Sequence, residues 1–253
     1  MILMTVFQDF FTGLQFLTRF RMVKQSDWSP ASFGRSVKFF PVIGAVIGVS
    51  LAGVNYLLHD YLPPHILAAI IVLAGIVITG GLHCDGLMDT ADGIFSGRSR
   101  ERMLEIMKDS RVGANGVVVF GLFILLKWSL ILDMNTAILS TALFVAPVAA
   151  RLAMVIGITS FPYARPDGMG KAFAQYAGRP ALYLAFFFSF ILIVPLGKLA
   201  IISLTASVLC CMVVARYVTS ILGGLTGDVY GAITELGELV TLAVFGIIAY
   251  IMI

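Results

Sequence analysis

Seven apolar runs separated by polar segments constrain this chain more than any other feature of its sequence. A helix needs about 20 residues to cross the hydrocarbon core of a bilayer. Only 12% of the 253 residues are charged, which is too few to coat a soluble domain of this size. The composition therefore excludes an ordinary soluble enzyme, a disordered chain, a coiled coil and a nucleic-acid-binding protein. The apolar runs cover residues 39–57, 65–83, 112–132, 137–160, 181–195, 199–221 and 236–253.

These runs predict an all-α, polytopic integral membrane helix bundle with about seven spans, formed by residues 1–253 as a single transmembrane domain. Residues 1–22 precede the first span. There, phenylalanine and leucine recur at helical spacing with polar residues between them. This pattern favours an N-terminal helix that lies in the membrane interface.

The basic residues are distributed unevenly among the loops. Thirteen of them lie in the N-terminal segment and in alternate loops, whereas the loops in between contain only Lys198. Cytoplasmic loops carry the excess of Lys and Arg in membrane proteins. We therefore expect a multi-pass protein of the cell inner (cytoplasmic) membrane, with the N-terminus and the loops 84–111, 161–180 and 223–235 in the cytoplasm and the C-terminus outside.

The first polar stretch that contains candidate functional residues begins with Asp85, Asp89 and Asp92. Their spacing of i, i+4 and i+7 places the three carboxylates within about 60° on one face of a helix. Three like charges beside a membrane are costly unless a cation neutralises them. Carboxylate oxygens are typical Mg²⁺ ligands, together with substrate phosphates. This spacing indicates a metal site at the start of a cytoplasmic catalytic segment, residues 84–111.

A group of basic residues follows in the same segment, with one further acid among them. Metal-bound carboxylates next to cationic side chains are what a phosphoanhydride substrate requires. The positive-inside rule by itself explains the sign of these basic residues but not the aspartates. The residues are Arg98, Arg100, Arg102, Lys108 and Arg111, with Asp109 among them.

A second acidic group lies near the C-terminus. Asp228 and Glu235 are seven residues apart on one helical face, and Glu238 lies one turn beyond Glu235. Acids at the border of a span generally have a function. Two interpretations stay open: the acids act on substrate, or they pair with Arg216 or Arg151 and hold the bundle together.

The motif GG-x-H-x-DGL-x-DT-x-DG, which begins at Gly80, is followed by RMLEIMKDSRVGANG and resembles the cobalamin synthase family, the adenosylcobinamide-GDP ribazoletransferases. The similarity extends to FFPVIGAVIG at 39–48 and GGLTGDVYGAITELGEL at 223–239. The segment 161–200 is the least constrained, and Arg165 is one of its candidates for substrate contact.

This resemblance implies a Mg²⁺-dependent membrane enzyme. The enzyme would join adenosylcobinamide-GDP to α-ribazole or its 5′-phosphate, release GMP and complete the nucleotide loop of cobalamin. We expect Asp85, Asp89 and Asp92 to hold the Mg²⁺ ion. The expected catalytic residues are Asp85, Asp89, Asp92, Asp109, Asp228 and Glu235. The expected substrate-binding residues are His83, Arg98, Arg100, Lys108, Arg111, Arg151 and Glu238.

The expected partners are the two small-molecule substrates and membrane lipid, without nucleic acid. A homo-oligomer, or association with other enzymes of late cobalamin assembly, is a further expectation that the residues leave open. Two other functions also stay open at this point. A cation-coupled transporter would use intramembrane acids, although no internal repeat is visible. A CDP-alcohol phosphotransferase would also place aspartates at a membrane border, but its DGxxAR pattern is missing here.

Overall fold

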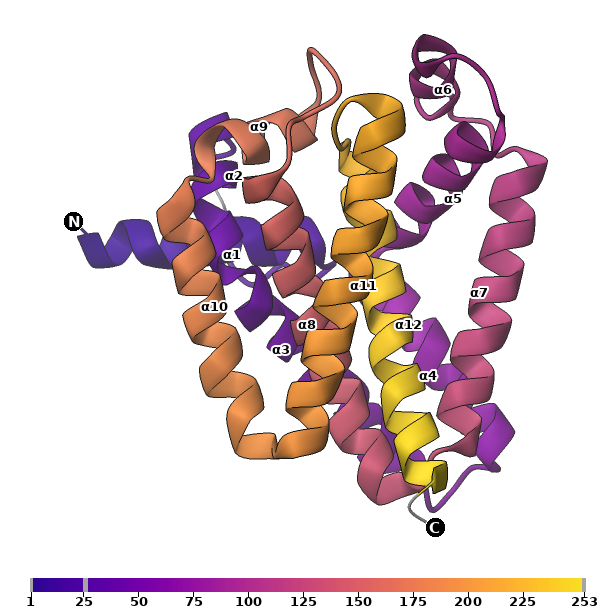
Figure 1. Ribbon diagram of the computed structural model, residues 1–253. Coiled ribbons are helices and arrows are strands. Elements are labelled where there is room, and N and C mark those ends of the chain that lie inside the picture. Colours follow the sequence, from indigo (N-terminus) through magenta and orange to yellow (C-terminus); the bar gives the residue numbers. More distant parts are fainter. Residues whose placement is uncertain (1, 25–26, 252–253) are drawn as a thin grey trace.

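The computed structural model describes residues 2–24 and 27–251 and shows a bundle of long helices (Figure 1). Within those ranges the β-structure is limited to an isolated bridge between Tyr163 and Leu225, so the predicted all-α fold is confirmed. In this described part of the chain, six helices are long and apolar enough to cross a membrane, or seven if one bent pair counts as a span. The elements are α1 (Ile2–Leu17), α2 (Pro30–Ser36), η1 (Val37–Phe39), α3 (Phe40–Leu58), α4 (Pro64–Thr79), α5 (Leu82–Phe95), α6 (Arg100–Ile106), α7 (Ala114–Asp133), α8 (Thr136–Ser160), α9 (Met169–Tyr176), α10 (Arg179–Ile193), η2 (Val194–Leu196), α11 (Lys198–Leu222) and α12 (Gly227–Ile251).

Helix α8 forms the centre of the bundle, and α3 packs closely against it. A Cβ atom on Gly44 would lie 2.5 Å from the carbonyl oxygen of Pro147, and one on Gly48 would lie 2.7 Å from that of Phe144. Two glycines four residues apart therefore allow the two backbones to touch, as small residues do between membrane helices.

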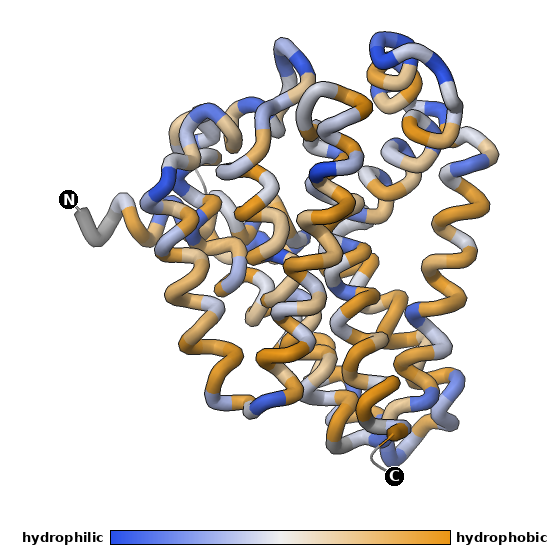
Figure 2. Tube along the Cα trace, in the orientation of Figure 1, coloured by the Kyte–Doolittle hydropathy of each residue, from blue (hydrophilic) through white to orange (hydrophobic). Residues whose placement is uncertain are grey.

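The α10–α11 hairpin forms an outer layer. Its exposed side chains include Phe187, Phe190, Leu209 and Val213. Apolar residues cover the length of the long helices, and hydrophilic residues gather most densely at the end that carries α6 and α9 (Figure 2). Such an apolar exterior fits contact with lipid chains and is typical of a multi-pass membrane protein.

Helix α1 runs across the bundle near its polar end (Figure 1). Its polar face is buried against the protein. The carboxylate of Asp9 is 2.9 Å from Arg35 Nε and 3.0 Å from Lys38 Nζ. The helix predicted over residues 1–22 thus ends at Leu17 and is anchored by two ion pairs to the segment that leads into α3.

The span predicted at 65–83 is shorter than expected. Helix α4 ends at Thr79, and the next two residues, Gly80 and Gly81, have φ angles of +66° and +72°. Only glycine adopts this left-handed conformation readily. The chain then turns by 91° into α5. The first acidic group therefore lies on a helix that is angled away from α4.

The last helix begins earlier than predicted. Helix α12 begins at Gly227 rather than near residue 236, so the whole second acidic group lies on the first turns of one long helix. The remaining spans begin and end within two residues of their predicted positions.

Candidate active site

Helices α5 and α12 cross at two glycines. A Cβ atom on Gly86 would lie 2.6 Å from the carbonyl oxygen of Asp228, and one on Gly231 would lie 3.2 Å from that of His83. Side chains at these positions would push the helices apart. The close crossing brings the aspartates of α5 next to the N-terminal turn of α12.

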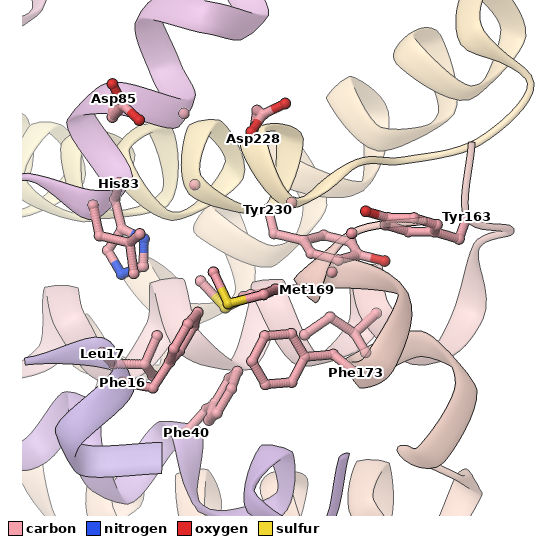
Figure 3. A pocket seen from close by; sticks show the side chains of 18 of the residues that line it. Phe16, Leu17, Phe40, His83, Asp85, Tyr163, Met169, Phe173, Asp228 and Tyr230 are labelled. Carbon is pink, nitrogen blue, oxygen red and sulfur yellow. The ribbon is translucent and has the colours of Figure 1, made fainter. Parts of the chain in front are cut away.

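A cavity of about 190 Å³ lies beside this crossing and is lined by residues of α1, α3, α5, α8, α9 and α12. Figure 3 shows Asp85 and Asp228 on one side of the cavity and the aromatic rings of Phe16, Phe40 and Phe173 on the opposite side. The cavity therefore combines acidic groups with an apolar wall.

Arg165 places a positive charge beside these acids. Its segment is fixed by two backbone hydrogen bonds of 2.8 Å, from Ala164 N–H to the carbonyl oxygen of Leu225 and from Leu225 N–H to that of Pro162. Arg165 Nη2 lies 2.8 Å from Asp228 Oδ2. Arg165, which the sequence indicates only as a candidate for substrate contact, lines the cavity and is therefore a site residue.

Asp89 belongs to the same charge cluster. It is half-buried, and the negative charges of Asp85 and Asp228 act on it together with the positive charge of Arg165. Three carboxylates thus share one region with one nearby guanidinium. Such an excess of negative charge favours the binding of a cation.

The carboxylate of Asp92, the third predicted metal ligand, binds backbone N–H groups in the structure. Its Oδ2 accepts a hydrogen bond of 2.7 Å from Gly113 N–H, and its Oδ1 accepts one of 2.8 Å from Gly116 N–H. The buried carboxylate of Asp92 therefore satisfies backbone donors at the start of α7 and stabilises that helix end.

The donor set of the site suits Mg²⁺ only when substrate contributes. In residues 2–24 and 27–251, no three or more His, Cys, Asp or Glu side chains are grouped so that they could hold a metal ion. Mg²⁺ commonly uses one or two carboxylates together with phosphate oxygens and water. Asp85 and Asp89, with Asp228 close by, fit that type of coordination.

Glu235 and Glu238 lie away from this cavity, in a buried ion cluster between α7, α8 and α12. Lys127 Nζ is 3.3 Å from Glu235 Oε2 and 2.7 Å from Glu238 Oε2. Arg151 Nη1 donates to Glu238 Oε1, and Cys84 Sγ is 3.5 Å from Glu235 Oε1. Glu238 thus pairs with Arg151, one of the two arginines that the sequence offered as partners. The other arginine, Arg216, is exposed. These contacts favour a role in holding the bundle together.

The predicted basic residues of segment 84–111 do not line the cavity. Arg100 donates to the carbonyl oxygens of Leu222 and Ala164, at 2.7 and 3.2 Å. Lys108 Nζ lies 3.2 Å from Asp167.

Asp109 and Arg111 pair with each other in the exposed loop after α6. Their hydrogen bonds lower the pKa of Asp109 to about 2. Arg98 is exposed. Of the predicted substrate-binding residues, His83 does line the cavity. Its Nε2 is buried and has no hydrogen-bond partner in the described part of the chain.

The fold and the site define an integral membrane protein with a carboxylate-lined cavity at the polar end of its helix bundle. A family model described as Cobalamin-5-phosphate synthase matches residues 9–246. The chain belongs to this family.

Two relatives illustrate the similarity. The adenosylcobinamide-GDP ribazoletransferase of Desulforamulus reducens is 40% identical over 241 residues, which cover 92% of this chain and 94% of that protein. The protein of the same name from Acetivibrio thermocellus is 35% identical over 232 residues, or 91% and 94% of the two chains. No solved structure matches this chain.

Proposed function

We propose that this protein transfers adenosylcobinamide phosphate from adenosylcobinamide-GDP to α-ribazole or α-ribazole 5′-phosphate. The products are GMP and adenosylcobalamin or its 5′-phosphate, which makes this the last assembly step of the nucleotide loop. The family match over nearly the whole chain is the observation that carries this proposal. Relatives with this activity favour it over a CDP-alcohol phosphotransferase and over a transporter.

The reaction exchanges one bond to phosphorus for another. A hydroxyl oxygen of the acceptor bonds to the phosphorus next to cobinamide, and the bond from that phosphorus to the oxygen shared with GMP breaks. The acceptor hydroxyl loses its proton to a base. Asp228 fits this role because it lines the cavity beside Asp85, and Arg165 holds its carboxylate in place.

We also propose that Asp85 and Asp89 hold Mg²⁺ together with phosphate oxygens of the donor. When bound, such an ion neutralises negative charge on the phosphates. The protein itself excludes water on the far side of the site with the aromatic wall of Phe16, Phe40 and Phe173.

The purified protein is expected to release GMP only when both substrates are present. The assay would follow nucleotides by chromatography in detergent or in lipid nanodiscs, with reactions that lack the acceptor as controls. Chelation of divalent ions should stop the release, and added Mg²⁺ should restore it. GMP release without acceptor, or CMP release from a CDP-alcohol, would contradict the proposed transfer.

The acidic cavity is proposed to face the cytoplasm across the inner membrane. Position 171 belongs to α9 and position 198 is the first residue of α11; both are exposed. Helix α9 and the start of α11 lie at opposite ends of the bundle (Figure 1). In a background without Cys84, Cys210 and Cys211, a cysteine at 198 should react in intact cells with an impermeant reagent that has reached the outer face of this membrane, and one at 171 should be protected. The reverse labelling pattern would overturn this orientation.

A further inference from the structure

A second cavity of about 500 Å³ meets the first one at Asp85. The second cavity lies beside the Gly80–Gly81 bend and is bordered by the end of α1, by the start of α5 and by α7. It shares Phe16, Leu82 and Asp85 with the first cavity. Asp85 therefore stands where the two cavities meet. A reaction that joins two substrates needs such an arrangement, in which each substrate reaches the reacting atoms from its own side.

The first cavity suits a flat, largely apolar group. Its volume of about 190 Å³ is somewhat larger than the cavity of about 150 Å³ that binds benzene in an apolar protein core. Aromatic rings such as Phe16, Tyr163 and Tyr230 line it (Figure 3). Aromatic rings pack well against a planar ring system.

This first cavity also holds polar atoms that lack partners. Tyr230 Oη, His83 Nε2 and Arg165 Nε are buried and have no hydrogen-bond partner among the described residues. Buried polar groups are normally paired, so the residues that carry these atoms favour a ligand with hydroxyl groups or ring nitrogens. The cavity's net charge is unfavourable for an anion, because two carboxylates oppose the single guanidinium of Arg165.

The second cavity has the opposite electrostatic character. Arg19 and Arg21 line it, and Asp85 is the acid among its lining residues. Both arginines are exposed, and neither forms an ion pair with another described residue. Their side-chain hydrogen bonds are long: 3.4 Å from Arg19 to the carbonyl oxygen of Gly80, and 3.3 Å from Arg21 to that of Gln15. A guanidinium that is exposed, has no acidic partner and forms only long hydrogen bonds binds phosphate oxygens well.

Two local features add to this anion preference. Helix α5 begins at the same cavity, and no side chain caps its N-terminal backbone N–H groups, which attract negative charge. Arg19 is also built into the bend, since a Cβ atom on Gly80 would lie 2.0 Å from Arg19 Nε. The missing side chain at Gly80 therefore leaves room for an arginine against the bend before α5.

We propose that the two substrates occupy separate cavities on either side of Asp85. The diphosphate of the nucleotide-bearing donor binds at Arg19 and Arg21, and the flat base of the acceptor nucleoside lies in the aromatic cavity under Tyr230 and His83. This inference rests on the proposed function and assigns each substrate to a part of the site. It also places the phosphate contacts in the segment that follows α1 rather than at the basic residues of segment 84–111.

Variants in one cavity should change the KM of the substrate that binds there and leave the KM of the other substrate unchanged. Arg19→Gln and Arg21→Gln should each raise the KM for adenosylcobinamide-GDP about tenfold, because a charge-assisted hydrogen bond is lost, and leave the KM for α-ribazole within about twofold. Met169→Trp narrows the aromatic cavity from its exposed rim, and Tyr230→Phe removes one unpaired hydroxyl. Both should raise the KM for α-ribazole and leave that for the donor unchanged.

Arg102→Gln is the matched control for charge loss at this end of the bundle, because Arg102 is exposed and pairs with Glu105. It should change neither constant. The wild-type protein in the same assay reports on the function itself: without GMP release, the proposed function fails. If the wild type is active, a KM increase for the opposite substrate, or no change in either KM, would overturn the division into two cavities.

Discussion

Asp85→Asn is expected to lower the rate of GMP release by about 10²-fold or more, because it removes charge at the point where the two cavities meet. The side chain keeps its size. The exposed carboxylate of Asp85 makes no hydrogen bond or ion pair with another described residue, so the folded protein loses no contact. Repulsion from Asp89 and Asp228 is also relieved. We therefore expect an unchanged or slightly higher melting temperature.

Asp92→Asn provides the matched comparison on the same helix. The substitution is chemically identical, but it affects a buried group that accepts two backbone hydrogen bonds at the start of α7. It should lower the melting temperature, because the amide accepts through one oxygen only. Near-normal turnover of Asp85→Asn at limiting Mg²⁺ would show that Asp85 neither binds the metal nor contacts the reacting groups.

Glu238→Gln is expected to cause the largest loss of stability. Glu238 contacts both buried cations, Lys127 and Arg151, and its neutralisation leaves Arg151 without an acidic partner. Breaking a buried ion pair from one side costs about 3–5 kcal/mol. The melting temperature and the yield of purified protein should therefore fall markedly.

Glu235→Gln is the graded control for this prediction. Among the described cations Glu235 contacts only Lys127, at 3.3 Å, and Lys127 retains Glu238 in this variant. The loss of stability should be smaller. Measurement of GMP release on the same samples separates structure from catalysis. A Glu238→Gln protein that melts like the wild type but has lost turnover would restore the catalytic interpretation of this acidic group.

The spans could be predicted closely from the sequence because they depend on a local property. An apolar run of sufficient length must be helical in lipid, since each backbone polar group needs an internal partner. The termini of α7, α8 and α11 follow directly from where polar residues interrupt these runs. The bend after α4 is different, because Gly80 and Gly81 permit a left-handed turn without requiring it.

The aspartates of α5 show where sequence reasoning stops. Helical periodicity correctly places Asp85, Asp89 and Asp92 on one side of a helix. That side of α5 is wide enough to contact two different neighbouring elements. Asp85 and Asp89 lie near α12 and Arg165, whereas Asp92 meets the start of α7. Periodicity describes a helix on its own and cannot say which neighbour each side chain meets.

The sequence by itself determined the all-α membrane bundle, the polar end with its acids, and the family, because these follow from local composition and from contiguous motifs. Only the tertiary structure decided which charges meet. It paired Lys127 and Arg151 with Glu238, and it brought Arg165 to Asp228 and Arg19 to the bend before α5. These partners are far apart in the chain, and their contacts depend on how closely helices cross at glycines such as Gly86, which no local pattern encodes.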